Sequence, residues 1–320
     1  MGFAILDSSS LDKEKWGKLV TTSESAAFYH TFEWCSLWEK SYNFCHSLFF
    51  VEEKDSEYSL GLPVVKFKKK GLESFFSMPM GTYGGVLSQG SAESEIKEFL
   101  LQALDSIKSF KCLKFQIVDF NGQLSFLGRD GFKPHQTFTH IVELEKINLG
   151  KYLTRRGYRQ LERSNVTARR IETAAEVQGC YGLYLKTCHR HLSAPKYSER
   201  FYQNLFWAGK DTGWLLWRIA GSKEKIIGYQ INFNFKEQLH LWDAASDPEN
   251  VKLRANDYLM GQSLIWCQQH RTCSYNLGGS PKGAEGLMRF KEHWGGTEKN
   301  YYIYEKIFPL GKLVDLFRGK

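Results

Sequence analysis

A lysine and a glycine-rich turn stand close together near the end of the sequence. The segment Asn276–Gly296, NLGGSPKGAEGLMRFKEHWGG, contains the turn GGSPKG and then Lys291. Backbone amides at Gly278 and Gly279, together with a nearby cation, can stabilise negative charge on a carbonyl oxygen or hold a phosphate. This spacing predicts an oxyanion or phosphate site. A purely structural turn is the equally common alternative for such a loop.

Asp243 is the second candidate catalytic group. It follows Leu239-His-Leu-Trp, which we interpret as a strand, and precedes the irregular segment Ser246–Asn256. Proteins of the α/β class place catalytic groups at such strand ends. A turn or capping aspartate is the competing interpretation.

A basic stretch is the third candidate site. Residues 151–170 contain seven basic side chains, and Arg156, Arg159 and Arg163 are spaced three and four residues apart. On a helix this spacing puts the three guanidinium groups on one face, where they suit a diphosphate or an RNA backbone. The alternative is a solvated helix face.

Several familiar motifs are absent from the sequence. It has no P-loop, GxSxG, HExxH or paired CxxC motif. The groups Cys188-His189-Arg190-His191 and Cys267–Cys273 lack a second pair at zinc spacing. We therefore expect no metal and no bound cofactor.

The elements that must position these residues can be read from hydrophobic periodicity. Leu287, Phe290 and Trp294 fall on one face of a short helix, and we expect Lys291 to lie beside that face rather than on it. A longer helix over 92–110 has an apolar face made of Ile96, Phe99, Leu100, Ala103, Leu104 and Ile107. Strict alternation over Ile226–Phe235 predicts a strand.

These elements occur in an order that repeats along the chain. Each half reads as helices, antiparallel strands, an irregular segment, a long helix, a strand, a short helical turn and a last strand. This order predicts an α/β fold of the α+β type, with two tandem lobes that each contain a mixed sheet flanked by helices. We place the lobes at residues 1–147 and 148–320.

Composition limits the partners and the compartment. The chain has 320 residues, a net charge of +8, a pI of about 9.0 and seven cysteines. The positive charge favours an anionic partner, and an odd cysteine count without a secretory signal favours a cytoplasmic protein. No apolar run is long enough to span a membrane, although peripheral membrane contact remains open.

The second half resembles a known family. The stretches LRANDYLM, YNLGGSP and GLMRFKEHWGG, together with MPMGTYGG in the first half, are similar to the FemAB-like branch of the GNAT superfamily. The resemblance implies two fused GNAT-like lobes. It also implies transfer of an aminoacyl group from aminoacyl-tRNA to an amine of a peptidoglycan precursor, without a metal.

The resemblance also implies site residues. Lys291 matches the lysine of the family's FK motif near the reaction centre, and Tyr258 matches a helix tyrosine. Arg159 or Arg163 matches the basic helix where precursor phosphates are expected, and Tyr83 lies in the shared TYGG turn. The glycine-rich GNAT loop that cradles the CoA diphosphate is absent between Ala245 and Leu259, which disfavours acetyl-CoA.

The sequence therefore predicts an N-acyltransferase that acts on an envelope precursor with phosphate or sugar groups. The acyl donor is a co-substrate, either aminoacyl-tRNA or an acyl-CoA. Asp243 would take a proton from the amine, and Lys291 with the Gly278–Gly279 amides would stabilise the oxyanion. The alternatives are a CoA-dependent N-acetyltransferase and a non-catalytic protein that binds RNA or the precursor. tRNA is one candidate partner, through the aminoacyl-tRNA donor, and DNA is not an expected partner.

Overall fold

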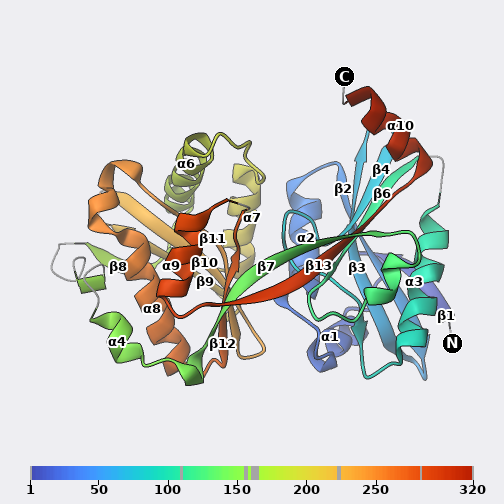
Figure 1. Cartoon of the computed structure of the whole chain (residues 1–320), viewed down its shortest axis with the longest axis horizontal. Coiled ribbons are helices and arrows are strands. Elements are labelled where there is room, and N and C mark those ends of the chain that lie inside the picture. Colours follow the sequence, from blue (N-terminus) through green and yellow to red (C-terminus); the bar gives the residue numbers. More distant parts are fainter. Residues whose placement is uncertain are drawn as a thin grey trace. The chain divides into compact units, whose positions relative to one another are not determined.

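The computed structural model describes residues 2–108, 111–154, 158–159, 166–221, 225–281 and 283–318. The chain forms two compact units, which we call unit 1 (Met1–Thr137 with Asn300–Lys320) and unit 2 (Phe138–Lys299). Each unit contains a mixed sheet with helices packed against it (Figure 1). In the described part of the chain, no helix has both the length and the apolar character needed to cross a membrane.

Unit 1 contains a sheet in the order β1-β2-β3-β4-β6-β13, with β5 paired to β3. Among the described strands of this unit, β4 and β6 are the pair that runs in parallel. Its elements are β1 (Gly2–Asp7), α1 (Lys13–Thr22), η1 (Phe28–His30), α2 (Phe32–Ser41), β2 (Cys45–Lys54), β3 (Glu57–Lys69), β4 (Leu72–Ser77), β5 (Leu87–Ser88), α3 (Glu93–Ile107), β6 (Cys112–Asp119), η2 (Ser125–Gly128), most of β13 (Thr297–Ile307) and α10 (Pro309–Arg318).

Unit 2 contains a sheet in the order β7-β12-β11-β10-β9-β8. Here β11 and β12 are the parallel pair. Its elements are most of β7 (Lys133–Glu143), η3 (Leu144–Lys146), α4 (Leu149–Leu153), β8 (Thr167–Arg170), α6 (Ala174–Arg190), α7 (Glu199–Gly209), β9 (Leu215–Gly221), β10 (Ile226–Phe235), β11 (Gln238–Ser246), η4 (Pro248–Leu253), α8 (Ala255–Gln269), β12 (Ser274–Gly279) and α9 (Glu285–His293).

The two units repeat the same arrangement, as the sequence predicts. In each, three antiparallel strands are followed by a helix and then by a strand that pairs in parallel with the third. The strands and helix are β2-β3-β4, α3 and β6 in unit 1, and β9-β10-β11, α8 and β12 in unit 2. A parallel pair needs a crossover connection, and α3 and α8 supply it.

The last strand of each repeat belongs to the other unit. Strand β7 follows the first repeat in sequence but pairs with β12, and β13 follows the second repeat but pairs with β6. The compact units therefore differ from a simple division at residues 147 and 148. Hydrophobic alternation locates a strand, but it does not say which sheet the strand joins.

Buried helix faces hold each sheet in place. All six residues of the predicted apolar face of α3 are buried, and they pack with strand residues such as Phe115 and Ile117. In unit 2, Met260, Leu264 and Cys267 of α8 pack against Tyr275 and Leu277 of β12.

Unit 2 has helices on both faces of its sheet, as alternation along β10 shows. Tyr229 contacts Tyr202 of α7, whereas its neighbour Gln230 accepts a hydrogen bond from Ser263 of α8. Successive side chains of a strand point to opposite faces. The α7 side and the α8 side are therefore the two faces of this sheet.

Candidate active site

The parallel strands β11 and β12 separate at their carboxyl ends. They pair over Gln238–His240 and Ser274–Asn276, after which β11 continues to Ser246 and β12 to Gly279. A bulge lies in this part of β11, because Ile231 pairs with Asp243 and Asn232 pairs with Leu241, which leaves Trp242 as the extra residue. Bulges bend strands and redirect side chains. The pairing of the two strands therefore stops at the end of the sheet where α/β proteins bind ligands.

Lys291 of α9 is buried against the end of β12, with 3% of its surface exposed. Its ammonium group donates to three oxygens, the carbonyls of Gly278 and Gly279 at 2.7 Å each and Ser280 Oγ at 3.0 Å. Burial lowers the pKa of Lys291 to about 7. All three protons of the ammonium are used, so in this arrangement Lys291 holds the Gly278–Ser280 segment in place.

The sequence-based prediction that Lys291 lies beside the buried face of α9, rather than on it, is wrong. Leu287, which we expected on the buried face, is 41% exposed, whereas Lys291 is buried with Trp294. The physical reason is that the glycine segment presents three oxygens toward the helix and so compensates the buried cation.

The Gly278 amide is also already engaged. It donates to Asn276 Oδ1 at 2.9 Å, and the same oxygen accepts a 2.7 Å hydrogen bond from the hydroxyl of Thr139. Gly278 has φ +75, and a Cβ at this position would lie 3.1 Å from the carbonyl of Leu241. A glycine is required here both by the backbone conformation and by the close approach to β11.

Two histidines lie near Lys291. Burial lowers the pKa of His240 to about 3, and the charge of Lys291 contributes to the shift. Burial and then Lys291 also lower the pKa of His140, while Glu292, at 4.0 Å from its Nε2, opposes the shift. Both imidazoles are therefore neutral at neutral pH, and neither adds positive charge around Lys291.

Asp243 lies in the part of β11 that has separated from β12, not at the end of the strand. Its Oδ2 accepts hydrogen bonds from the hydroxyls of Tyr202 on α7 and Tyr229 on β10, at 2.5 Å each. Burial raises the pKa of Asp243, and both hydroxyls partly oppose that shift. A carboxylate with a raised pKa is a stronger base, which suits proton transfer near neutral pH. No hydrogen bond or ion pair joins Asp243 and Lys291.

The predicted binding residues lie in different places. Arg159 is exposed, and Tyr258 is a half-buried residue of α8 whose ring packs on Tyr158 at 5.2 Å. Tyr83 is buried in unit 1, where its ring contacts Phe120 at 4.3 Å. Arg156 and Arg163 lie outside the described residues.

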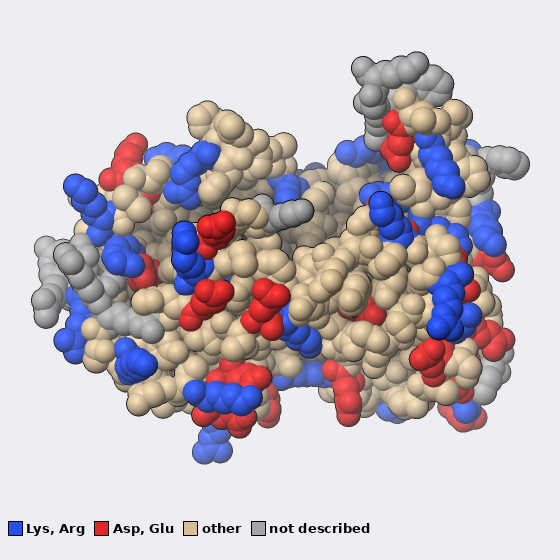
Figure 2. Space-filling view, viewed as in Figure 1, with Lys and Arg blue, Asp and Glu red and all other residues tan. Residues whose placement is uncertain are grey.

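On the face shown in Figure 2, Lys and Arg alternate with Asp and Glu, so the charged residues described there form no continuous basic track.

A cavity of ≈ 640 Å³ lies at the start of α8, where the glycine-rich GNAT loop is missing. Its lining includes Ser246, Lys252, Arg254, Asn256 and Phe290. Helix η4 occupies the loop's place in the sequence, and Asp247 caps it. Arg254 also forms a 3.0 Å ion pair with Asp257. The cavity is therefore positively lined, but one of its cations is already partly neutralised.

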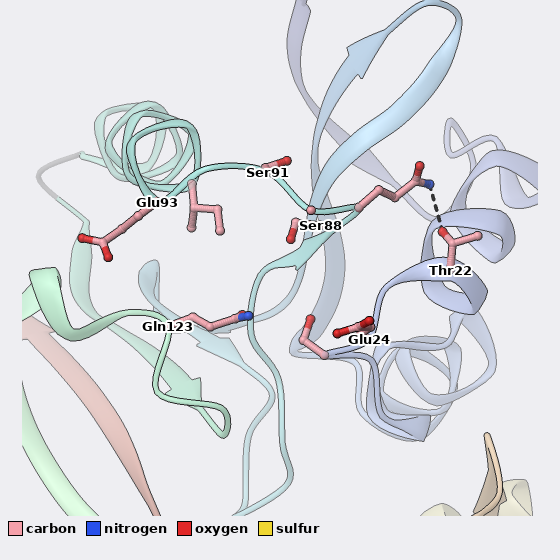
Figure 3. Close-up of a pocket in the computed structure, with 10 residues that line it drawn as sticks. Thr22, Glu24, Ser88, Ser91, Glu93 and Gln123 are labelled. Atoms are coloured by element: carbon pink, nitrogen blue, oxygen red, sulfur yellow. Dashed lines mark hydrogen bonds between the residues drawn. The ribbon is translucent and has the colours of Figure 1, made fainter.

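Unit 1 has a second cavity, of ≈ 570 Å³, between the end of α1, the segment before α3 and Gln123 (Figure 3). Hydroxyl and amide groups dominate its lining, and Gln89 donates to Thr22 Oγ1 at 2.9 Å across one side. Its charged lining residues are Glu24 and Glu93, and the described lining contains no Lys or Arg. This cavity does not suit the phosphate groups of a precursor.

Comparison with known proteins identifies the second half of the chain. Residues 151–292 match the acetyltransferase (GNAT) domain family. This region is a GNAT acetyltransferase domain. The match includes β8 to β12 with Asp243 and Lys291, and it makes the protein an acyltransferase of the GNAT type. No curated protein sequence matches the chain.

Solved structures share the GNAT fold over nearly the whole chain. FemX superposes with a TM-score of 0.74 at 13% identity, covering 98% of this chain and 100% of FemX. A tandem GNAT protein from the clavulanic acid biosynthesis pathway gives 0.60 at 10%, covering 96% and 98% of the two chains. The C-terminal domain of a putative lysylphosphatidylglycerol synthetase from Agrobacterium fabrum gives 0.60 at 12%, covering 95% of each. The predicted tandem GNAT fold is confirmed.

Sequence reasoning missed four residues that lie around Asp243 and Lys291, namely Tyr202, Tyr229, His140 and His240. Alternation along β10 predicts that Tyr229 is inward-facing, but not that it meets Asp243. That contact depends on the bulge at Trp242, which shifts the register of β11 by one residue. The sequence carries no signal for such a shift.

Proposed function

We propose that the protein is an N-acyltransferase that transfers an aminoacyl or other activated acyl group to an amine of a cell-envelope precursor. The observation that carries the proposal is the separation of β11 from β12 in a GNAT domain, with Asp243 on one strand and Lys291 holding the end of the other. In this proposal an extended acyl donor pairs with the backbone of β11 beyond its last pair with β12, as in peptide recognition by strand addition.

In the proposed reaction the nitrogen of the neutral amine attacks the acyl carbonyl carbon. A C–N bond forms, and a tetrahedral intermediate carries the negative charge on oxygen. Asp243 accepts the proton from nitrogen, and the bond to the donor's leaving oxygen or sulfur then breaks. The proton passes from Asp243 to that leaving atom, so the carboxylate is regenerated.

Lys291 and the Gly278–Gly279 segment remain the proposed source of oxyanion stabilisation. Because the three protons of Lys291 and the Gly278 amide already have acceptors, Lys291 would act by fixing the segment's geometry and, up to its pKa of about 7, through its charge. A preorganised charge is effective in a site from which water is excluded.

The choice of an envelope substrate rests on the neighbours. The whole chain shares its fold with FemX, and another neighbour is named for the aminoacylated lipid lysylphosphatidylglycerol. We propose aminoacyl-tRNA or an acyl-CoA as donor, Arg156, Arg159, Arg163, Tyr258 and Tyr83 as substrate contacts, and the cytoplasm as the compartment.

The second candidate function is CoA-dependent N-acetylation. The cavity at the start of α8 favours it, because Lys252 and Arg254 lie beside a helix N-terminus, where a diphosphate is stabilised. The two candidates differ in the acyl donor, so donor binding separates them.

The experiment is a thermal-shift comparison followed by product analysis. Acetyl-CoA, a longer acyl-CoA, an aminoacyl-tRNA and a UDP-linked muropeptide are each added to the purified protein. A ligand at 100 times its Kd stabilises the folded state by about 2.7 kcal/mol, which is roughly 5–10 °C for a unit of this size.

A shift with aminoacyl-tRNA or the muropeptide, together with an acylated product by mass spectrometry, supports the envelope function. A shift with CoA thioesters alone supports the second candidate. Absence of both binding and product with all four compounds would overturn the proposal.

A further inference from the structure

The carboxylate of Asp243 is held by two tyrosines from different elements. Tyr202 comes from α7 and Tyr229 from β10, and both hydroxyls donate to the same oxygen, Oδ2. The two tyrosine oxygens lie 3.5 Å apart. Rotation of the carboxylate would break both bonds, so its orientation is fixed, and neither tyrosine engages Oδ1.

Both tyrosines are built into the core. Both side chains are fully buried. The ring of Tyr202 packs against the rings of Trp217 and Trp242, with centroid distances of 5.9 and 5.7 Å. Burial and the neighbouring Asp243 raise the pKa of both phenols. The hydroxyls therefore remain protonated donors over the whole range in which the carboxylate titrates.

Other groups that influence Asp243 lie on β11 itself, in the segment before α7 and on α6. The backbone N–H of Ala244 and the charge of Lys196 lower the pKa of the carboxyl group. Cys180 of α6 also interacts with Asp243, and burial raises the pKa of its thiol, so the sulfur is uncharged at neutral pH. In the described part of the chain, Tyr202 and Tyr229 are the side chains that donate hydrogen bonds to this carboxylate.

We infer that Tyr202 and Tyr229 are positioning residues for acyl transfer, which bind Oδ2 of Asp243 and direct Oδ1 to the attacking amine as the proton acceptor. This inference rests on the proposed function, because it assigns the proton transfer to Asp243. The tyrosines have a second effect. They offset part of the desolvation of the carboxylate, and so keep Asp243 ionised at the pH at which it must accept a proton.

The first test needs no substrate. The protein is labelled with ¹³C at the aspartate carboxyl groups, the Asp243 signal is assigned with Asp243→Asn, and its pKa is measured by NMR. Removing one donor by Tyr202→Phe or Tyr229→Phe should raise this pKa by about one unit, because a hydrogen bond to a charged group stabilises the ionised form by about that amount. Tyr275→Phe is the matched control. It removes a buried 2.7 Å hydrogen bond to Asn232 and should leave Asp243 unchanged.

The second test uses the acyl-transfer assay. In Tyr202→Phe and Tyr229→Phe, the acid limb of the pH profile of kcat should shift to higher pH by as many units as the pKa of Asp243 rises. The value of kcat should fall with little change in KM. In the Asp243→Asn background, either Tyr→Phe change should have no further effect on kcat. A merely structural contact would lower the melting temperature without moving the pH profile.

Each outcome decides a separate point. An Asp243 pKa that does not rise in either Tyr→Phe variant overturns the inference, whether or not the protein is active. A raised pKa with an unmoved acid limb also overturns it, because Asp243 would then not be the group that limits turnover. If no donor yields product with the wild-type protein while the pKa shift is present, the proposed function fails and the tyrosines are assigned only the tuning of the carboxylate.

Discussion

Replacing Lys291 with methionine tests the energetic account of the glycine segment. The change keeps the aliphatic stem but removes the ammonium, so the carbonyls of Gly278 and Gly279 and the hydroxyl of Ser280 lose their donor. At about 1 kcal/mol for each lost hydrogen bond, Lys291→Met should lower the free energy of unfolding by about 3 kcal/mol at pH 7.

The pH dependence of this difference provides a sharper test. Burial lowers the pKa of Lys291 to about 7 from 10.5. Between these values the unfolded chain binds more protons than the folded one, so the contribution of Lys291 to stability rises with pH. The rise is at most about 1.4 kcal/mol per pH unit, and about 2 kcal/mol from pH 7 to pH 9. The variant lacks this contribution.

The assay is urea denaturation of the wild-type protein and Lys291→Met at pH 7, 8 and 9. The wild-type advantage should grow by about 2 kcal/mol across this range. Both His140 and His240 have lowered pKa values, so they are neutral in the folded protein throughout the window. Tyr275→Phe is the control, since burial raises the pKa of that phenol beyond the window. A constant difference between the wild-type protein and Lys291→Met would show that the lysine keeps its proton, and the argument from burial would be refuted.

Three further predictions concern packing, the glycine segment and the basic stretch. Gly261→Ala should destabilise unit 2 by more than about 1 kcal/mol, because a Cβ would lie 2.3 Å from the ring of Tyr158. Gly286→Ala should instead stabilise the unit by up to about 1 kcal/mol, because no atom lies within 4 Å of the added Cβ. Melting temperatures of the two variants measure this difference. Asn276→Ala removes the acceptor of the Thr139 hydroxyl and the Gly278 amide and should cost about 2 kcal/mol, as measured by urea denaturation. Arg159→Ala should change stability by less than about 0.5 kcal/mol because Arg159 is exposed, but should weaken precursor binding in titration calorimetry; unchanged precursor binding would remove Arg159 from the site.

Periodicity predicted the parts of the fold that local burial controls. The six buried residues of α3, the strand at Ile226–Phe235 and the repeated element order all follow from spacing along the chain. The exchange of β7 and β13 between the units does not, because strand pairing is a long-range property. The resemblance and the residues together identified the GNAT domain, which is the coarser half of the functional prediction.

The site was predicted less completely, and the reason is again physical. Lys291 was singled out by residue type, but its burial depends on three oxygens that only the folded loop brings together. Asp243 was singled out by its place near a strand end, but its partners Tyr202 and Tyr229 converge on it through the packing of α7 and a bulge in β11.

The most direct test of the central claim is an acyl-transfer assay of the wild-type protein and Asp243→Asn, with product detected by mass spectrometry. Aminoacyl-tRNA and acyl-CoA are offered as donors to a UDP-linked muropeptide, and thermal shift confirms that both proteins bind the donor. We predict that the wild-type protein yields an acylated amine, and that Asp243→Asn binds the donor equally well but loses at least about 100-fold in kcat, the usual contribution of a general base. Equal turnover by the two proteins would contradict the assignment of Asp243 as the proton acceptor, and with it the account of the site.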